Sequence, residues 1–332
     1  MSTSGTSGTP WEILISPSEK LHRVLADLRA FLTNGYSFFD KTCCFLMPGF
    51  LPGRRYWFQD FGLIRISCFS QYDQLKRKLA ILTKGNYDII SSVSSDLLEV
   101  AEALVERDIK LTPPKMVVTR GELLQPKWRH TIHQGFGRDP TDFYGTVEFG
   151  LIGWQCRERQ GYHVDTDRLV HELVKGDAGV CPGEEGEVVI TDLVPRAMPL
   201  IRFATEDWSS GSGAPCPCGI KLPTLSHISG RVLDFLLLPS GEKIAPFLVT
   251  AQLQYIPGIM SYQVTQVSGS EVVVRFIRRR DISGDQSAAI VEALRPVFGD
   301  TMQLHVQEVA SIPRPPGKFR VVENALTRRG RI

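Results

Sequence analysis

The sequence predicts an α/β fold in two parts, a large domain over residues 1–233 and a smaller α+β domain over 234–332. Three observations predict it. Up to residue 137, helical and strand-like segments alternate, which is typical of a largely parallel sheet covered by helices. From about residue 145 strands and turns predominate, and the final part of the chain again mixes helices and strands in a compact unit.

The first half is expected to begin with a helix that Ser18 can cap and that Gly35 ends, because apolar residues between Leu21 and Leu32 keep helical spacing. The aromatic stretch 51–69 is irregular and then strand-like. The other elements of this half follow from apolar periodicity and capping residues. In chain order they are a helix over 72–85, a short strand over 87–90, a helix over 95–108 capped by Ser95 or Asp96, a strand over 115–119 and a helix over 125–137.

The second half is expected to be richer in strands. Residues 186–193 and 199–203 have a composition typical of strands, and residues 235–244 favour a hairpin with the tip "PSGEK". The remaining elements are expected as a helix over 247–256, strands over 262–267 and 271–279, a helix over 286–298 and a strand over 302–309.

The composition is that of a globular protein without a strong electrostatic field. Hydrophobic residues make up 42% of the 332 positions, charged residues make up 22%, and the formal net charge is +2. So small a charge argues against nucleic acid or a membrane surface as a partner. The sequence has no apolar run of roughly 18 residues and no secretion-signal pattern. Seven cysteines, an odd number, favour reduced thiols, so a cytoplasmic protein is expected.

The chain opens with "STSGTSGTP" (2–10), which allows two interpretations. Composition alone favours a flexible terminus. Glycine and hydroxyl residues can also form a phosphate cradle, because the backbone can approach an anion closely and the hydroxyls can donate hydrogen bonds to it. The stretch is not a Walker loop, since the Gly-Lys-Ser/Thr ending is missing.

Five further segments decide between these interpretations by their order along the chain. They are "DFYGTVEFG" (142–150), "GEVVITDL" (186–193), "MPLIRFATEDW" (198–208), "GRVLDFL" (230–236) and "PRPPGKFRVV" (313–322). With them, and with an opening similar to a phosphate loop, the chain resembles the adenylate-forming acyl-CoA synthetase superfamily over essentially its whole length. The likeness is to the phenylacetate–CoA ligase branch and its capsule-biosynthesis relatives.

This resemblance implies an AMP-forming ligase that uses ATP, Mg²⁺ and coenzyme A. Such an enzyme joins a carboxylic acid, here expected to be aromatic, to AMP and then passes it to coenzyme A or to a carrier-protein thiol. Because two anions must meet, charge neutralisation and positioning dominate the barrier. The resemblance assigns the phosphates to Ser4, Gly5, Thr6, Ser7, Gly8 and Thr9, the adenine pocket to Gly121, Glu122, Tyr144 and Gly145, the ribose to Asp207 and Arg231, Mg²⁺ to the catalytic residue Glu148, catalysis by a mobile lysine to Lys318, and the interdomain hinge to Asp234.

Two departures from the family pattern leave an alternative open. Val147 stands where the family usually has a hydroxyl residue before the glutamate. Relatives also carry about a hundred residues before the phosphate loop, so the chain is expected to lack the usual N-terminal region and to expose apolar surface. A second chain or a dimer partner could complete it. The alternative function is a degenerate or partial adenylate-binding protein that acts in binding or assembly without turnover.

Cys156, His163, Cys216 and Cys218 form a candidate structural zinc site. One imidazole and three thiolates suit tetrahedral zinc, whereas the spacing alone favours buried thiols without a ligand. A similar Cys…His and Cys-x-Cys-Gly arrangement holds zinc in the related branch, so the resemblance favours the metal. A zinc-stabilised interaction module is a third possible function, but it leaves the ordered nucleotide motifs unexplained.

Overall fold

The computed structural model describes most of the chain in nine segments. They are residues 12–47, 57–195, 197–212, 214–231, 235–244, 246–253, 256–279, 282–313 and 320–326. Within these segments no helix is both long enough and apolar enough to cross a membrane.

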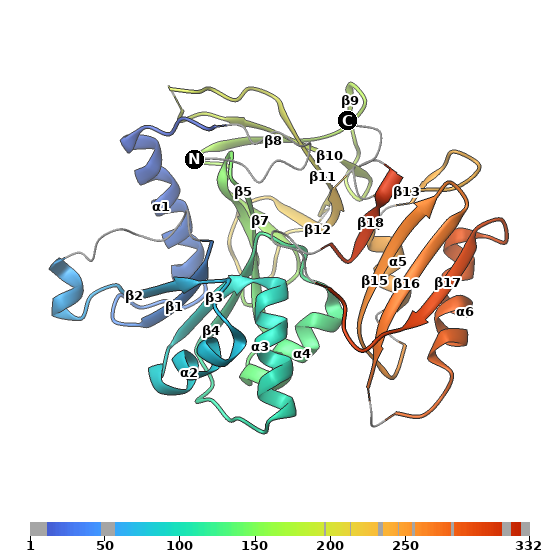
Figure 1. Ribbon diagram of the computed structural model, residues 1–332. Coiled ribbons are helices and arrows are strands. Elements are labelled where there is room, and N and C mark those ends of the chain that lie inside the picture. Colours follow the sequence, from blue (N-terminus) through green and yellow to red (C-terminus); the bar gives the residue numbers. More distant parts are fainter. Residues whose placement is uncertain are drawn as a thin grey trace.

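A mixed sheet occupies the first two thirds of the described chain (Figure 1). Its strands follow the order β2-β1-β3-β4-β5-β6-β7-β12-β11-β10-β8-β9. The parallel part contains β1 (Lys41–Leu46), β2 (Arg65–Ser70), β3 (Ile89–Val93), β4 (Met116–Arg120) and β5 (Pro140–Thr146). The antiparallel part contains β6 (Gly150–Trp154), β7 (Tyr162–Val164), β8 (Leu169–Lys175), β9 (Ala178–Gly179), β10 (Glu185–Asp192), β11 (Phe203–Gly211) and β12 (Thr224–Arg231).

One helix precedes the parallel strands and the others connect them, as βαβ units require. They are α1 (Pro17–Thr33), the 3-10 turn η2 (Trp57–Phe61), α2 (Leu75–Gly85), α3 (Ser94–Glu106) and α4 (Pro126–Phe136). The parallel arrangement predicted for the first half is therefore confirmed. The switch to antiparallel pairing begins at β6, where the sequence changes from alternating helices and strands to strands and turns.

A second, smaller sheet follows a short hairpin and lies beside the first (Figure 1). The hairpin pairs β13 (Leu236–Leu237) with β14 (Lys243–Ile244), as the sequence predicts. The sheet has the order β17-β16-β15-β18, so β18 forms one edge and β17 forms the other. Its elements are α5 (Pro246–Leu253), β15 (Ile259–Ser268), β16 (Glu271–Arg278), α6 (Gln286–Phe298), β17 (Gln303–Glu308) and β18 (Val322–Asn324).

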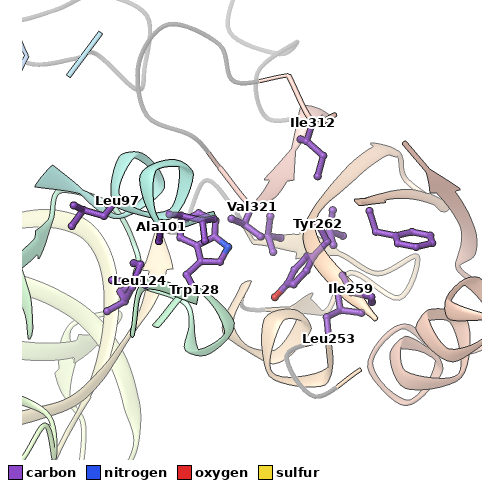
Figure 2. Packing of buried hydrophobic residues seen from close by; sticks show 14 of the residues in the cluster. Leu97, Ala101, Leu124, Trp128, Leu253, Ile259, Tyr262, Ile312 and Val321 are labelled. Carbon is purple, nitrogen blue, oxygen red and sulfur yellow. The ribbon is translucent and has the colours of Figure 1, made fainter. Parts of the chain in front are cut away.

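One cluster of buried side chains contains residues from both parts of the chain. Trp128 of α4 and Val321, which precedes β18, both belong to it, and Figure 2 shows them next to each other. Trp128 is 2% exposed and Val321 is 7% exposed. This contact fixes the small sheet against α4, so the space between the two parts of the chain has defined walls.

Helix α1 buries one face and exposes apolar side chains on another. Ala26 and Ala30 are buried, whereas Leu21, Val24 and Leu25 are at least half exposed. Single exposed apolar residues are common, but several on one helix form an apolar surface.

Three local predictions were wrong. The cap of α1 is Ser16, whose hydroxyl accepts a hydrogen bond from Glu19 N–H, because Pro17 takes the first helical position. Helix α3 starts one residue before the expected caps, since the Asp96 carboxylate pairs with Lys78 instead of capping. Residues 199–202 are not a strand, because Pro199 has no N–H group and Arg202 has a φ of 45°.

Candidate nucleotide site

A pocket with a volume of about 140 Å³ lies where the large sheet meets the small one. The large part of the chain supplies residues from the loop after β4, from the end of β5, from α4 and from β11 and β12. The small part supplies residues from α5 and from the segment leading into β18. The lining residues are Gly121, Glu122, Leu123, Gln125, Trp128, Asp142, Phe143, Tyr144, Gly145, Asp207, Ile228, Gly230, Pro246, Thr250, Arg320, Val321 and Val322.

The structure brings five of the predicted nucleotide-site residues to this pocket. They come from three separate stretches of sequence and are Gly121, Glu122, Tyr144, Gly145 and Asp207. Nothing about residue spacing alone requires these stretches to meet. Their convergence comes from the sheet, in which β4 and β5 are neighbours and β11 returns later.

The clearest interaction in the pocket joins Tyr144 and Asp207. The Tyr144 hydroxyl donates a hydrogen bond to Asp207 Oδ2 over 2.9 Å. Asp207 is 6% exposed, and its backbone N–H donates to the Thr205 hydroxyl. Glu206, the residue before it, has a φ of 64°, which few side chains adopt outside functional or strained sites. This irregularity lies within a break in the β10–β11 register and helps fix the direction of the Asp207 carboxylate.

Arg231 is the direct cross-strand partner of Asp207 in the β11–β12 ladder. The two positions assigned to ribose binding are therefore neighbours in the sheet. Only the backbone of Arg231 belongs to the described structure.

Glu122 has a structural partner next to the pocket. Its Oε2 accepts a hydrogen bond from the Ser95 backbone N–H over 2.9 Å, at the first turn of α3. A carboxylate in this position satisfies a free helical N–H group and favours the helix dipole. The loop after β4 is thus fastened to α3, which holds Gly121 and Glu122 at the pocket wall.

A buried carboxylate, that of Asp142, is part of the pocket wall. Its two oxygens accept hydrogen bonds from the Thr119 and Tyr162 hydroxyls, each over 2.6 Å. Burial raises the pKa of Asp142, and the nearby Arg129 guanidinium and the two hydroxyls act in the opposite direction. Sequence reasoning did not single out Asp142, although it begins the "DFYGTVE" motif.

Glu148 lies on the turn between β5 and β6 and is not among the residues lining the pocket. Gly145, three residues earlier, still lines the pocket. The Glu148 side chain is partly exposed. No hydrogen bond or ion pair of its carboxylate is seen with other described residues. A carboxylate without such partners can offer the hard oxygen ligand that Mg²⁺ prefers.

Several predicted positions lie outside the described residues. They are Ser4, Gly5, Thr6, Ser7, Gly8 and Thr9 of the phosphate loop, together with Asp234 and Lys318. Arg320 follows Lys318 by two positions and lines the pocket.

The four predicted zinc ligands come together where β6 ends and β7 begins. Cys156 follows β6, His163 is on β7, and Cys216 and Cys218 lie in the loop between β11 and β12. Their four ligand atoms lie within 4.8 Å of one another. The Sγ atoms of Cys156 and Cys216 are 3.6 Å apart, and Cys218 Sγ is 3.3 Å from His163 Nε2.

The Cys156–Cys216 and Cys218–His163 distances are close to those in a tetrahedral zinc site. Zn–S bonds of about 2.3 Å and Zn–N bonds of about 2.0 Å put neighbouring ligand atoms roughly 3.5–3.8 Å apart. Burial raises the pKa of Cys156 to about 12 and lowers the pKa of His163. Neutral imidazole is the metal-binding form, and a cation would supply the charge that a buried thiolate needs.

Sequence reasoning missed most of the pocket residues that come from α4 and from the small part of the chain. Gln125, Trp128 and Thr250 are examples. Gln125 is 2% exposed, and its Oε1 has no hydrogen-bond partner among the described residues. No motif marks these residues, because each lines the pocket only through the packing of α4 and α5.

Comparison with known protein families finds a match in the small part of the chain. Residues 236–325 match the family described as the CapK C-terminal domain. This segment begins at β13 and ends just after β18, so it contains the whole of the small sheet.

Two curated relatives match more than two thirds of the chain. The phenylacetate-coenzyme A ligase of Thermus thermophilus is 27% identical over 237 residues, which cover 69% of this chain and 50% of the relative. The enzyme of the same name from Pseudomonas putida is 24% identical over 289 residues, covering 78% of this chain and 63% of the relative. The chain therefore spans between half and two thirds of the length of these relatives.

Solved structures show the same fold. The 2-hydroxyisobutyryl-CoA ligase in its postadenylation state, in complex with 2-HIB-AMP, gives a TM-score of 0.79 at 19% identity, covering 99% of this chain and 74% of that enzyme. The same ligase in an open conformation gives 0.63, and in its thioesterification state 0.60. Sequence and structure together confirm the resemblance inferred from the motifs: the chain has the fold of the adenylate-forming CoA ligases and resembles their phenylacetate–CoA ligase and CapK-related branch.

Proposed function

We propose that the chain activates a carboxylic acid with ATP, forming an acyl-adenylate and pyrophosphate, and then transfers the acyl group to the thiol of coenzyme A. The hydrogen-bonded pair of Tyr144 and Asp207 carries this proposal. The pair lies in a pocket whose wall continues into Arg320, close in sequence to the proposed catalytic lysine. An aromatic acid is the substrate class that the names of the curated relatives favour.

In this proposal the nucleotide occupies the pocket. Gly121, Glu122, Tyr144 and Gly145 line the space for adenine. One oxygen of Asp207 is held by Tyr144, which orients the carboxylate to accept hydrogen bonds from the ribose hydroxyls. Arg231, across the ladder, is proposed to act with it. The phosphates are assigned to the loop from Ser4 to Thr9.

Charge neutralisation is proposed to come from two residues, Glu148 and Lys318. Glu148 is the proposed ligand for Mg²⁺, which when bound neutralises phosphate charge in such reactions. Lys318 is the proposed point charge that stabilises the transition state between the carboxylate and the α-phosphate. Both roles depend on placing charge where the two anions meet.

The limits of the two domains, 1–233 and 234–332, are part of the proposal. In such a ligase the C-terminal domain carries Lys318 and moves between the two half-reactions. The higher TM-score with the postadenylation state than with the other two states supports an arrangement suited to the first half-reaction. The contact between Trp128 and Val321 is part of this arrangement.

Zinc is proposed at the cluster of Cys156, His163, Cys216 and Cys218. The donor set is complete for a closed tetrahedral site, and such sites are structural. The metal would join the loop before β12 to the end of β6, so it would stabilise the antiparallel part of the sheet.

The function is tested by acid-dependent ATP–pyrophosphate exchange over a panel of aryl and alkyl acids. The wild-type chain is compared with Lys318→Ala and Glu148→Ala. Lys175→Ala and Glu172→Gln serve as matched controls, because both side chains lie on β8, away from the residues lining the pocket. We expect exchange in the wild type and in both controls. In the two site variants the exchange rate should fall by a factor of at least about 100.

Exchange that persists in Lys318→Ala and Glu148→Ala would contradict the assigned roles. A folded wild-type chain that binds ATP but catalyses no exchange with any acid would support the alternative, an adenylate-binding protein without turnover. Val147, which replaces a family hydroxyl, is the observation that favours this alternative. Product analysis with coenzyme A and with a carrier-protein thiol distinguishes the two acceptors.

A further inference from the structure

Arg23 of α1 contacts the turn that carries Glu148. Its Nη1 donates a hydrogen bond to the Val147 carbonyl oxygen over 2.9 Å, and its Nη2 donates to the Glu148 carbonyl oxygen. The two partners lie more than 120 residues further along the chain. A planar guanidinium that bonds two successive carbonyls fixes the orientation of the peptide group between them.

The arginine is itself held in place by Glu19. Arg23 Nη2 is 2.8 Å from Glu19 Oε1, one helical turn earlier, and the two side chains are 12% and 2% exposed. The second carboxylate oxygen, Glu19 Oε2, has no hydrogen-bond partner among the described residues. The buried carboxylate therefore neutralises the arginine, and each charge depends on the other.

The other side of the turn is anchored by packing. Phe149 is fully buried, and its ring lies 5.7 Å from that of Phe203. A Cβ atom at Gly145 would lie 2.3 Å from the Gly150 carbonyl oxygen, so the two ends of the turn can approach only without a side chain there. The turn is thus held by Phe149 on one side and by Arg23 on the other.

Within this turn the Glu148 side chain is the group left free. Its backbone is bonded to Arg23, while its carboxylate has no ion pair in the described structure. We propose that Arg23, together with Glu19, is a positioning residue that presets the Glu148 carboxylate for a divalent cation bound with ATP. This inference rests on the proposed function, because it assigns Glu148 to the metal.

The test compares Arg23→Gln with Arg29→Gln. Arg29 lies on the same helix and also pairs with residues of the sheet, Asp165 and Asp167, but it does not touch the turn. The first readout is the Mg²⁺ concentration that gives half-maximal ATP–pyrophosphate exchange at saturating ATP and acid. We expect it to rise about 10-fold in Arg23→Gln and less than about 2-fold in Arg29→Gln, with Arg23→Lys in between.

The second readout does not depend on activity. Hydrogen–deuterium exchange of the amides of residues 145–150 is measured without ligand, and the rise in Tm caused by ATP is measured over a series of Mg²⁺ concentrations. Arg23→Gln should speed amide exchange in the turn and shift the Mg²⁺ dependence of the Tm rise, whereas Arg29→Gln should do neither. If Arg23→Gln does not fold, Glu19→Gln with Arg23→Met removes both charges and leaves no buried ion unpaired.

The outcomes separate this inference from the proposed function. Faster amide exchange with an unchanged Mg²⁺ dependence would show a structural role alone and overturn the inference. Unchanged amide exchange would show that Arg23 does not hold the turn. If the wild type shows no pyrophosphate exchange, the proposed function fails, and the Mg²⁺ dependence of the ATP-induced Tm rise still decides the role of Arg23.

Discussion

Single hydrogen bonds define the direction of the polar groups in the pocket. The Asp207 carboxylate accepts a hydrogen bond from the Tyr144 hydroxyl. The Asp142 carboxylate accepts hydrogen bonds from the hydroxyls of Thr119 and Tyr162. A buried carboxylate whose hydrogen bonds come from fixed donors has little freedom to rotate. Asp207 is therefore held in one orientation before any ligand binds, and the cost of ordering it does not fall on binding.

One charged side chain near the pocket lacks such hydrogen bonds. Lys127, in the first turn of α4, has an Nζ atom that is buried and without a hydrogen-bond partner in the described part of the chain. Burial, and then the charge of Arg279, lower the pKa of Lys127 to about 7. An unsatisfied buried donor costs on the order of 1–3 kcal/mol.

This predicts the pH dependence of a Lys127→Met variant. The folded pKa lies below that of an unfolded lysine, so between about pH 7 and 10 the unfolded chain binds the additional proton. Wild-type stability should therefore gain from rising pH in this window. At pH 7 Lys127→Met should be more stable than the wild type by about 1–3 kcal/mol, and this advantage should shrink toward pH 10.

Thermal or urea unfolding at pH 7 and pH 10 measures this difference. Lys110→Met is the matched control, because Lys110 is 86% exposed and the substitution should change little at either pH. A Lys127→Met variant that is less stable than the wild type at pH 7 would mean that the amine is well paired.

At the scale of elements, the antiparallel part of the sheet depends on a long connection. The loop between β11 and β12 returns to the end of β6 through Cys216 and Cys218. β12 pairs with β7 through only two residue pairs, Thr224 with His163 and Leu225 with Tyr162. A metal at the four ligands would reinforce this short ladder.

We therefore predict one zinc ion per chain, measured by elemental analysis of the purified protein. Removing it with a chelator should lower the Tm by at least about 5 °C, since a structural zinc contributes to folding directly. Cys218→Ser should have the same effect, and added zinc should restore the chelated wild type but not the variant. Cys181→Ser is the control, because Cys181 is an exposed thiol outside the cluster. A zinc-free wild type with an unchanged Tm would contradict the prediction.

Much of the local structure follows from sequence, because it depends on neighbours along the chain. The periodicity of α3 and α4 and the "PSGEK" hairpin tip correctly predicted their elements. The errors at Ser18 and at 199–203 arose where a proline changed the backbone. Such effects move boundaries by a few residues and leave the element order unchanged.

Some residues of the site could be predicted from the sequence, and others could not. Tyr144 and Asp207 lie 63 residues apart, and the resemblance to a family brought them into one site before their hydrogen bond was seen. Arg23, Gln125 and Thr250 had no such signal. Their places follow from the packing of α1 on the β5–β6 turn and of the small sheet on α4, which no local pattern records.

At the scale of the whole molecule, the pocket belongs to neither part of the chain alone. The large sheet supplies Tyr144 and Asp207, and the small part supplies Thr250 and Arg320. A ligand bound there would contact both parts, so binding and the relative position of the parts are coupled. Such coupling is what a ligase with two half-reactions requires, and it depends on the pocket being a nucleotide site.

The most direct test of that claim is calorimetric titration of ATP into the wild type, Asp207→Ala and Asp167→Ala in the presence of Mg²⁺. Asp167 is a matched control, since its side chain is 64% exposed and lies outside the pocket. We predict one ATP per chain in the wild type and in the control. Asp207→Ala should weaken binding by about 10- to 100-fold, as expected for the loss of charged hydrogen bonds worth about 1.5–3 kcal/mol. Equal affinity in Asp207→Ala and the wild type, or no binding to the folded wild type, would contradict the account.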